Sequence, residues 1–161
     1  MVENQKEYYV LIFKLFIMNR LKDKVIIVTG GSKGIGRATC KMAAREGAQV
    51  AITDVVDEEG KKTRDEILDE SGKAEYWHLD VSEESEVEKV FSEINDAYGR
   101  VDILVNNAGI SGVNKPTDKI DLEAWQKVMN VNVNGVFLCT KHAIPYLRKS
   151  GKGNIINLSS I

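Results

Sequence analysis

The sequence predicts an α/β protein in which helices cover both faces of a parallel sheet, the doubly wound architecture. Short apolar segments of the kind that form buried strands recur along the 161 residues, and segments of helical period separate them. Each separating segment is long enough for a right-handed crossover between parallel strands. A glycine-rich turn, residues 30–36, directly follows the first of these strands. These observations predict one domain with a ligand crevice at the carboxyl ends of its strands.

The apolar pattern assigns the elements in order. Runs such as Val25–Thr29 and Gln49–Thr53 are continuously apolar, as expected for strands buried on both faces. Glycines at 47 and 99 follow amphipathic segments and are typical helix ends. We predict strands at 24–29, 49–53, 74–79, 101–105 and 154–158, and helices at about 35–47, 57–70, 82–99 and 121–148.

Helix boundaries carry further local signals. Asp57 begins an acidic first turn, which the helix dipole favours, and Ser82 is a plausible N-cap for the third helix. The fourth helix is the longest, and its apolar side chains recur at helical spacing. We expect its buried face to consist of Leu122, Trp125, Val128, Met129, Val136, Phe137, Thr140, Ile144 and Leu147.

Composition limits the classes of function. The chain is 43% hydrophobic and 29% charged, as in globular proteins, and its net charge is −2. A pI near 5.8 gives no electrostatic basis for binding nucleic acid or an anionic membrane surface. The two cysteines, Cys40 and Cys139, lie in helical segments without metal-type spacing, so we expect buried packing residues and no metal site. They favour a reducing, cytoplasmic location.

Residues 1–17 are expected to be an N-terminal extension of a domain that spans residues 18–161. The segment 8–18 is apolar, but Lys14 interrupts it and it is shorter than the roughly 20 residues of a membrane-spanning helix. Glu3 and Glu7 precede it, which disfavours a secretory signal. Two interpretations remain, an added strand or helix and an upstream start with Met18 as the natural first residue, and the second is favoured.

Glycine or a polar residue stands at or just beyond the end of each predicted strand. A helix N-terminus after the glycine turn offers unpaired N–H groups and partial positive charge to a phosphate. Within the turn, Gly30 can adopt angles closed to other residues, Gly34 allows a ligand to approach, and Gly36 allows tight helix packing. The alternative is an ordinary strand-to-helix turn. The five strand ends are marked by Gly30, Asp54, Asp80, Asn107 and the pair Ser159–Ser160.

The spacing Thr-Gly-x-x-x-Gly-x-Gly at 29–36 resembles the cofactor loop of the short-chain dehydrogenase/reductase family. The segments 106–109 (Asn-Asn-Ala-Gly), 132–137 (Asn-Val-Asn-Gly-Val-Phe) and 155–160 match further motifs of that family in order. The resemblance implies a Rossmann fold, a small-molecule alcohol or ketone substrate and a homo-oligomer, dimer or tetramer. Sugar epimerases are disfavoured because their loop spacing is Thr-Gly-x-x-Gly-x-x-Gly.

The resemblance also implies which residues contact a nicotinamide cofactor. Asp54, about 20 residues beyond Gly36, can accept hydrogen bonds from adenosine ribose hydroxyls and repel a 2′-phosphate, which favours NAD over NADP. Lys33 favours NADP instead, because a basic residue in the glycine turn can bind a 2′-phosphate. The alternative interpretations are a solvated strand end for Asp54 and a helix cap for Asp80. The implied contacts are Thr29, Gly30, Ser32, Lys33, Gly34, Ile35, Gly36, Asp54, Asp80, Val81, Asn107, Ala108 and Gly109.

For catalysis, the resemblance implies that Ser160 donates a hydrogen bond to the substrate oxygen. It places Asn132 at a helix kink, linked through water to a catalytic lysine. The family's Tyr-x-x-x-Lys motif is missing from this sequence. We therefore expect an N-terminal fragment of an NAD(H)-dependent oxidoreductase, related to glucose, hydroxysteroid or cyclic-alcohol dehydrogenases or to 3-oxoacyl-carrier-protein reductases.

The missing motif leaves three interpretations of the chain itself. As an incomplete Rossmann domain it is expected to be inactive alone, although the full-length protein is an enzyme. The first alternative is a non-catalytic nucleotide-binding remnant. The second is a fragment that folds poorly, because the apolar face of its long helix is left bare.

Overall fold

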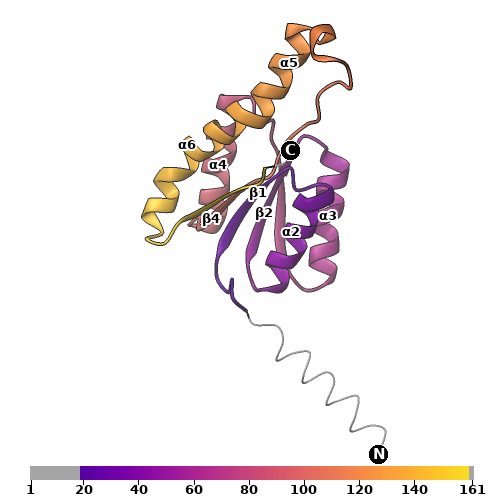
Figure 1. The fold of residues 1–161 in the computed structure, drawn as a ribbon. Helices are drawn as coiled ribbons and strands as arrows, with labels where there is room; N and C mark the ends of the chain where they lie inside the picture. The colour runs from indigo at the N-terminus through magenta and orange to yellow at the C-terminus, as the bar shows by residue number, and fades with distance from the viewer. Residues whose placement is uncertain (1–18, 160–161) are drawn as a thin grey trace, which may run out of the picture.

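Five parallel strands form one sheet in the order β3-β2-β1-β4-β5 in the computed structural model, which describes residues 19–159 (Figure 1). The predicted extension, 1–17, and Ser160 lie outside the described residues. The doubly wound fold class is confirmed. The strands are β1 (Val25–Thr29), β2 (Gln49–Asp54), β3 (Lys73–His78), β4 (Ile103–Asn106) and β5 (Asn154–Asn157).

Helices cover both faces of the sheet, because successive β-strand side chains point to opposite sides. Ile26 and Val28 pack with the residues of α2 and α3, whereas Val25 and Ile27 pack with those of α4 and α6. Helix α5 projects past the edge of the sheet (Figure 1). The helices are α2 (Gly34–Arg45), α3 (Asp57–Asp69), α4 (Glu84–Tyr98), α5 (Leu122–Met129) and α6 (Gly135–Lys149), with a 3₁₀ turn at Thr117–Lys119.

The predicted long helix at 121–148 is interrupted. Asp121 caps its start, with the carboxylate accepting a hydrogen bond from the Ala124 N–H at 2.7 Å. A π-helical turn, Asn130–Asn134, then separates α5 from α6. Asparagine and valine are poor helix formers, and a π turn inserts one extra residue into the helical repeat.

The buried face predicted for this helix is wrong in part. Leu122, Trp125 and Phe137 are 69%, 54% and 63% exposed. Leu147 is buried as predicted, but the other buried positions of α6 are Gly135, Cys139 and Ala143. Small residues allow α6 to approach the sheet and α4 closely, and Phe137 lies on another side of the helix.

Most element boundaries differ from the prediction by one or two residues, and two of these differences involve aspartate side chains. The N-cap of α4 is Glu83 rather than Ser82, because the Ser82 hydroxyl donates to Oδ1 of Asp80 at 2.7 Å instead. Strand β4 begins at Ile103 rather than at position 101. The residue before it, Asp102, has a side chain only 1% exposed and accepts a hydrogen bond from the Val25 N–H at 3.0 Å.

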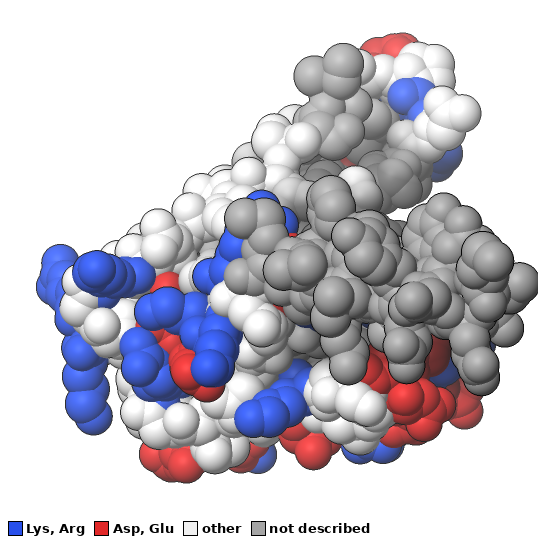
Figure 2. All heavy atoms as spheres, turned by 90° about the horizontal axis from the view of Figure 1, so that it is seen from below, with Lys and Arg blue, Asp and Glu red and all other residues white. Residues whose placement is uncertain are grey.

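The described surface mixes both signs of charge. Figure 2 shows lysine and arginine side chains lying beside aspartate and glutamate over the described residues. Across 19–159, no helix is both long and apolar enough to cross a membrane. Strand β5, at one edge of the sheet, is exposed along its whole length.

Candidate functional site

A threonine and an asparagine tie the ends of β1 and β4 together. The Thr29 hydroxyl oxygen accepts hydrogen bonds from the backbone N–H groups of Asn107 and Ala108, both at 3.0 Å. The Asn107 side-chain amide donates to the carbonyls of Thr29 at 2.8 Å and of Gly30 at 3.0 Å. These four bonds fix the two central strand ends, where doubly wound sheets bind ligands.

Two glycines let the turn after β1 close against α2. Gly30 has a φ of +64°, in the left-handed region that L side chains rarely adopt. A Cβ at Gly36 would lie 2.1 Å from the Gly30 carbonyl oxygen and 2.5 Å from Nδ2 of Asn107. Neither position has room for a side chain. The expectation of tight strand-to-helix packing at Gly36 is therefore confirmed.

The N-terminus of α2 faces the same edge of the sheet and has no negative charge of its own. Its cap residue, Lys33, makes no side-chain capping bond, and its first turn contains no acidic residue, whereas α3 and α4 both begin with acidic residues. The space beside Gly34 is open, and Ile35 is 67% exposed. The first N–H groups of α2 are thus accessible to an anion.

The Asp54 carboxylate lies at the end of β2 and is bonded to the glycine turn. Its Oδ2 accepts a hydrogen bond from the Ser32 N–H, and its Oδ1 accepts one from the Val56 N–H, both at 3.0 Å. A carboxylate has about four lone-pair positions, so each oxygen can accept a second donor. Because Asp54 is only half-buried, a ligand with two adjacent hydroxyl groups can reach it.

Asp80 and Val81 are bonded into the approach to α4. Oδ1 of Asp80 accepts from the N–H and the hydroxyl of Ser82, at 2.9 and 2.7 Å. Val81 is 6% exposed, and its side chain packs against Gly135, where a Cβ would lie 2.7 Å from Val81 Cγ2. These contacts show that Asp80 shapes the start of the helix, whereas its contact with a cofactor stays a prediction.

Asn132 lies in the π-helical turn and pairs with the loop after β4. Its Oδ1 accepts a hydrogen bond from the Ile110 N–H at 2.9 Å, and its Nδ2 donates to the Ile110 carbonyl at 3.0 Å. The loop directly follows Gly109, whose position for a Cβ is 3.4 Å from Asn132 Oδ1. Asn132 thus lies in a local interruption of the α-helix, whereas the kink and the water link to a lysine stay predictions.

Sequence analysis did not find the residues that support Asp54 and the glycine turn from neighbouring elements. The buried Thr63 hydroxyl of α3 donates to the Ser32 carbonyl at 3.1 Å. The Tyr76 hydroxyl of β3 donates to the Asp54 carbonyl at 2.7 Å. A single threonine or tyrosine carries no motif, and only the pairing of β2 with β3, which sets Tyr76 opposite Ile52, brings its hydroxyl within reach of the Asp54 carbonyl.

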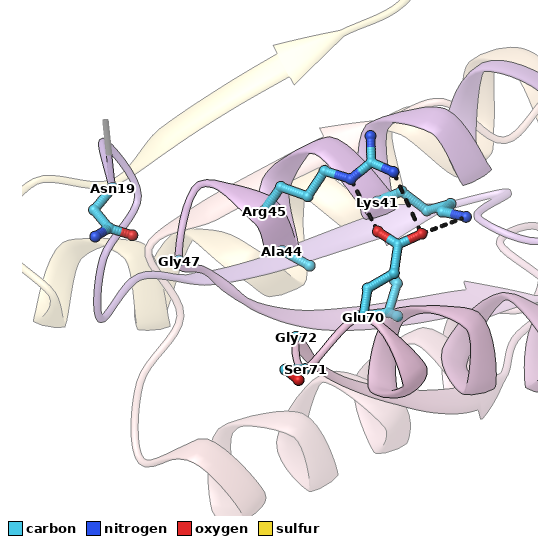
Figure 3. A pocket seen from close by; sticks show the side chains of 9 residues that line it. Asn19, Lys41, Ala44, Arg45, Gly47, Glu70, Ser71 and Gly72 are labelled. Carbon is cyan, nitrogen blue, oxygen red and sulfur yellow. Dashed lines mark hydrogen bonds and ion pairs between the residues drawn. The ribbon is translucent and has the colours of Figure 1, made fainter. Parts of the chain in front are cut away.

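A hollow of about 270 Å³ lies at the opposite edge of the sheet, between the last turns of α2 and α3 (Figure 3). Its charged side chains are paired with one another: Glu70 lies 2.9 Å from Arg45 and 3.1 Å from Lys41. Those two cations lower the pKa of Glu70, with Arg45 the larger contributor. Because these charges are paired with one another, little charge remains in this hollow to bind a ligand.

Both thiols are packing residues, as predicted. Cys40 and Cys139 are 0% and 1% exposed, and burial raises the pKa of each to about 12. Within residues 19–159, no three potential metal ligands of the His, Cys, Asp or Glu type lie close together.

Comparison with known proteins identifies the family to which this chain belongs. The family model described as short chain dehydrogenase matches residues 24–161. The chain therefore belongs to the short chain dehydrogenase family, and the resemblance found in the sequence is confirmed. The family is one of oxidoreductases, and its fold implies a nicotinamide dinucleotide cofactor.

The curated relatives include alcohol and steroid dehydrogenases. Cyclopentanol dehydrogenase from Comamonas sp. is 42% identical over 144 residues, covering 89% of this chain and 57% of that protein. 3beta-hydroxysteroid dehydrogenase from Mediterraneibacter gnavus is 38% identical over 146 residues, covering 91% and 52%. The chain thus spans about half the length of the curated relatives it matches.

Solved structures support the same fold. Levodione reductase matches with a TM-score of 0.84 and 34% identity, covering 88% of this chain and 55% of that one. A metagenomic short-chain oxidoreductase in complex with NADP matches with a TM-score of 0.84 and 31% identity, covering 88% and 64%.

Proposed function

We propose that this chain is the N-terminal, cofactor-binding part of an NAD(H)-dependent oxidoreductase that interconverts a secondary alcohol and a ketone. The names cyclopentanol dehydrogenase and 3beta-hydroxysteroid dehydrogenase, carried by two relatives, support the cyclic-alcohol and hydroxysteroid types of substrate. When bound, the nicotinamide would supply or accept the hydride. The chain's own residues would hold the cofactor and polarise the substrate.

The residues at the carboxyl edge of the sheet fit a dinucleotide. The uncapped first turn of α2 offers N–H groups to a pyrophosphate, and Gly34 leaves the space beside that turn open. The bonds between Thr29 and Asn107 would keep β1 and β4 in place on either side of the cofactor. The proposed contacts are Thr29, Gly30, Ser32, Lys33, Gly34, Ile35, Gly36, Asp54, Asp80, Val81, Asn107, Ala108 and Gly109.

The proposal of NAD rather than NADP rests on the Asp54 carboxylate. It is held by the N–H groups of Ser32 and Val56 and keeps acceptor positions for both ribose hydroxyls. A phosphate on the ribose 2′-oxygen would instead meet a fixed negative charge. Lys33 opposes this preference only weakly because its side chain is exposed and its charge is solvated. The metagenomic structural neighbour is in complex with NADP, so related structures differ in the cofactor from the one proposed here.

Catalysis is proposed to use Ser160 and Asn132. Hydride arriving at a carbonyl carbon leaves negative charge on the oxygen, and a serine hydroxyl aimed at that oxygen lowers the barrier. Asn132 would hold the loop at Ile110 in place. Because the Tyr-x-x-x-Lys motif is missing from these 161 residues, we propose that the chain alone binds cofactor without turnover. A protein that only binds nucleotide is the rival function.

Titration of the 161-residue chain with NADH and NADPH, followed by nicotinamide fluorescence, tests the cofactor proposal. We expect NADH to bind at least about tenfold more tightly, a difference of about 1.4 kcal/mol. Asp54→Ala should abolish or reverse that preference. The control is Glu58→Ala, which removes an exposed negative charge from the nearby first turn of α3 without touching the strand end. Equal affinities for the two nucleotides in the unmodified chain would refute the proposal.

The assembly and location are also proposals. Exposed apolar side chains on α5 and α6, Trp125 and Phe137 among them, support a homo-oligomer. Free, buried cysteines support a reducing compartment such as the cytoplasm. Neither nucleic acid nor a membrane is proposed as a partner.

A further inference from the structure

The Tyr76 hydroxyl lies between two acceptors at the end of β2. It is 2.7 Å from the Asp54 carbonyl oxygen and 2.8 Å from Oδ1 of Asp57, in the first turn of α3. The Asp54 carbonyl also accepts a hydrogen bond from the Leu79 N–H at 3.0 Å. A single tyrosine side chain thus bridges the strand end and the helix that follows it.

The surroundings of Tyr76 keep its hydroxyl a donor. Burial, reinforced by the Asp57 carboxylate, raises the pKa of Tyr76. Hydrogen bonds from His78, at 2.7 Å, and from Tyr76 lower the pKa of Asp57. Asp57 is therefore ionised at neutral pH and accepts only, so Tyr76 must be the donor, and its single phenolic proton is shared between Asp57 and the Asp54 carbonyl.

Gly60, on α3, leaves room for the Tyr76 ring. A Cβ at Gly60 would lie 2.1 Å from Cε2 of Tyr76, so the ring lies directly against the helix backbone. The ring cannot turn toward α3, and its hydroxyl stays directed at Asp54. Neither the glycine nor the tyrosine belongs to a sequence motif for cofactor binding.

Asp54 is consequently held at four points. Its carboxylate oxygens accept from Ser32 and Val56, and its carbonyl accepts from Leu79 and Tyr76. Three of these donors are backbone N–H groups that any sequence would supply. The Tyr76 hydroxyl is the one side-chain donor among them.

We infer that Tyr76 is a positioning residue that sets nucleotide selectivity by fixing Asp54. This inference rests on the proposed function, because it assigns the selectivity to the same carboxylate. A carboxylate that moves with a loosened strand end would hold the ribose hydroxyls less well and repel a 2′-phosphate less strongly. Loss of the hydroxyl should therefore weaken NADH binding more than NADPH binding.

Tyr76→Phe tests the inference because it removes the hydroxyl and keeps the ring against Gly60. We expect about threefold to tenfold weaker NADH binding, with NADPH affinity changed by less than about twofold. Tyr98→Phe is the matched control: Tyr98 is another half-buried tyrosine, on α4, with its ring edge against Trp77. The control should leave the ratio of affinities unchanged.

A double variant distinguishes an effect on the position of Asp54 from a general loosening of the protein. In an Asp54→Ala background, Tyr76→Phe should no longer change the ratio, because the carboxylate through which it acts is gone. An unchanged ratio in the single variant, or the same change with Tyr98→Phe, would overturn the inference. If the unmodified chain binds neither nucleotide, the proposed function itself fails.

Amide hydrogen exchange then tests the positioning without any nucleotide. The N–H groups of Ser32 and Val56, which donate to the Asp54 carboxylate, should exchange several-fold faster in Tyr76→Phe than in the unmodified chain. Exchange that stays unchanged at both amides would overturn the positioning role.

Discussion

Replacing Gly36 by alanine should damage both the fold and cofactor binding, because of a clash that can be located in the structure. The new Cβ would lie 2.1 Å from the Gly30 carbonyl oxygen, whereas real Cβ contacts are essentially never closer than 3.0 Å. The neighbour is backbone and cannot rotate away. The turn after β1 must therefore shift by roughly 1 Å, which is the scale of an overpacked core position.

The size of the effect follows from three contributions. Overpacking costs about 1–3 kcal/mol, and weakening the bond from Asn107 to the Gly30 carbonyl costs about 1 kcal/mol more. Alanine in a helix recovers about 1 kcal/mol relative to glycine. The net destabilisation is about 2 kcal/mol, which should lower the melting temperature by roughly 4–8 °C.

Urea unfolding and a thermal melt of the 161-residue chain measure the stability, and NADH fluorescence measures the binding. We expect more than about tenfold weaker NADH binding, since the displaced turn carries the N–H groups proposed to hold the pyrophosphate. Gly112→Ala is the control, because its Cβ would meet only Val128, at an ordinary 3.7 Å. A Gly36→Ala chain with unchanged stability and NADH affinity would refute this reasoning.

Two further predictions concern buried ionisable groups. Asp102 should stabilise the fold in a pH-dependent way: burial opposes its charge, but bonds from Arg100 and the Val25 N–H prevail and lower its pKa below the ordinary 3.8. Asp102→Asn should therefore lower the free energy of unfolding by about 2 kcal/mol near pH 7. This difference from the unmodified chain should shrink as the pH falls below about 4. Equal stabilities at pH 7 in urea unfolding would contradict the prediction. Cys40 and Cys139, whose pKa burial raises to about 12, should resist iodoacetamide at pH 8 until the chain is unfolded; mass spectrometry that finds either thiol labelled in the native chain would show it to be accessible.

The sequence alone determined the order of the five strands and of helices α2, α3 and α4, and the place of the glycine turn. These features follow from local signals. Apolar runs predict buried parallel strands, and Gly30 and Gly36 lie where backbone angles or close packing exclude a side chain. Asp54 could be placed at the glycine turn because both follow neighbouring strands of a parallel sheet.

Only the tertiary structure decided which side chains support the carboxyl edge of the sheet and which side chains are exposed. Tyr76 reaches Asp54 through the pairing of β2 with β3, and Thr63 reaches Ser32 from α3. Phe137 is exposed because α6 packs through small residues instead. Periodicity reports only which residues of one element share a face. Strand register and helix packing, which bring residues of different elements together, depend on the whole core.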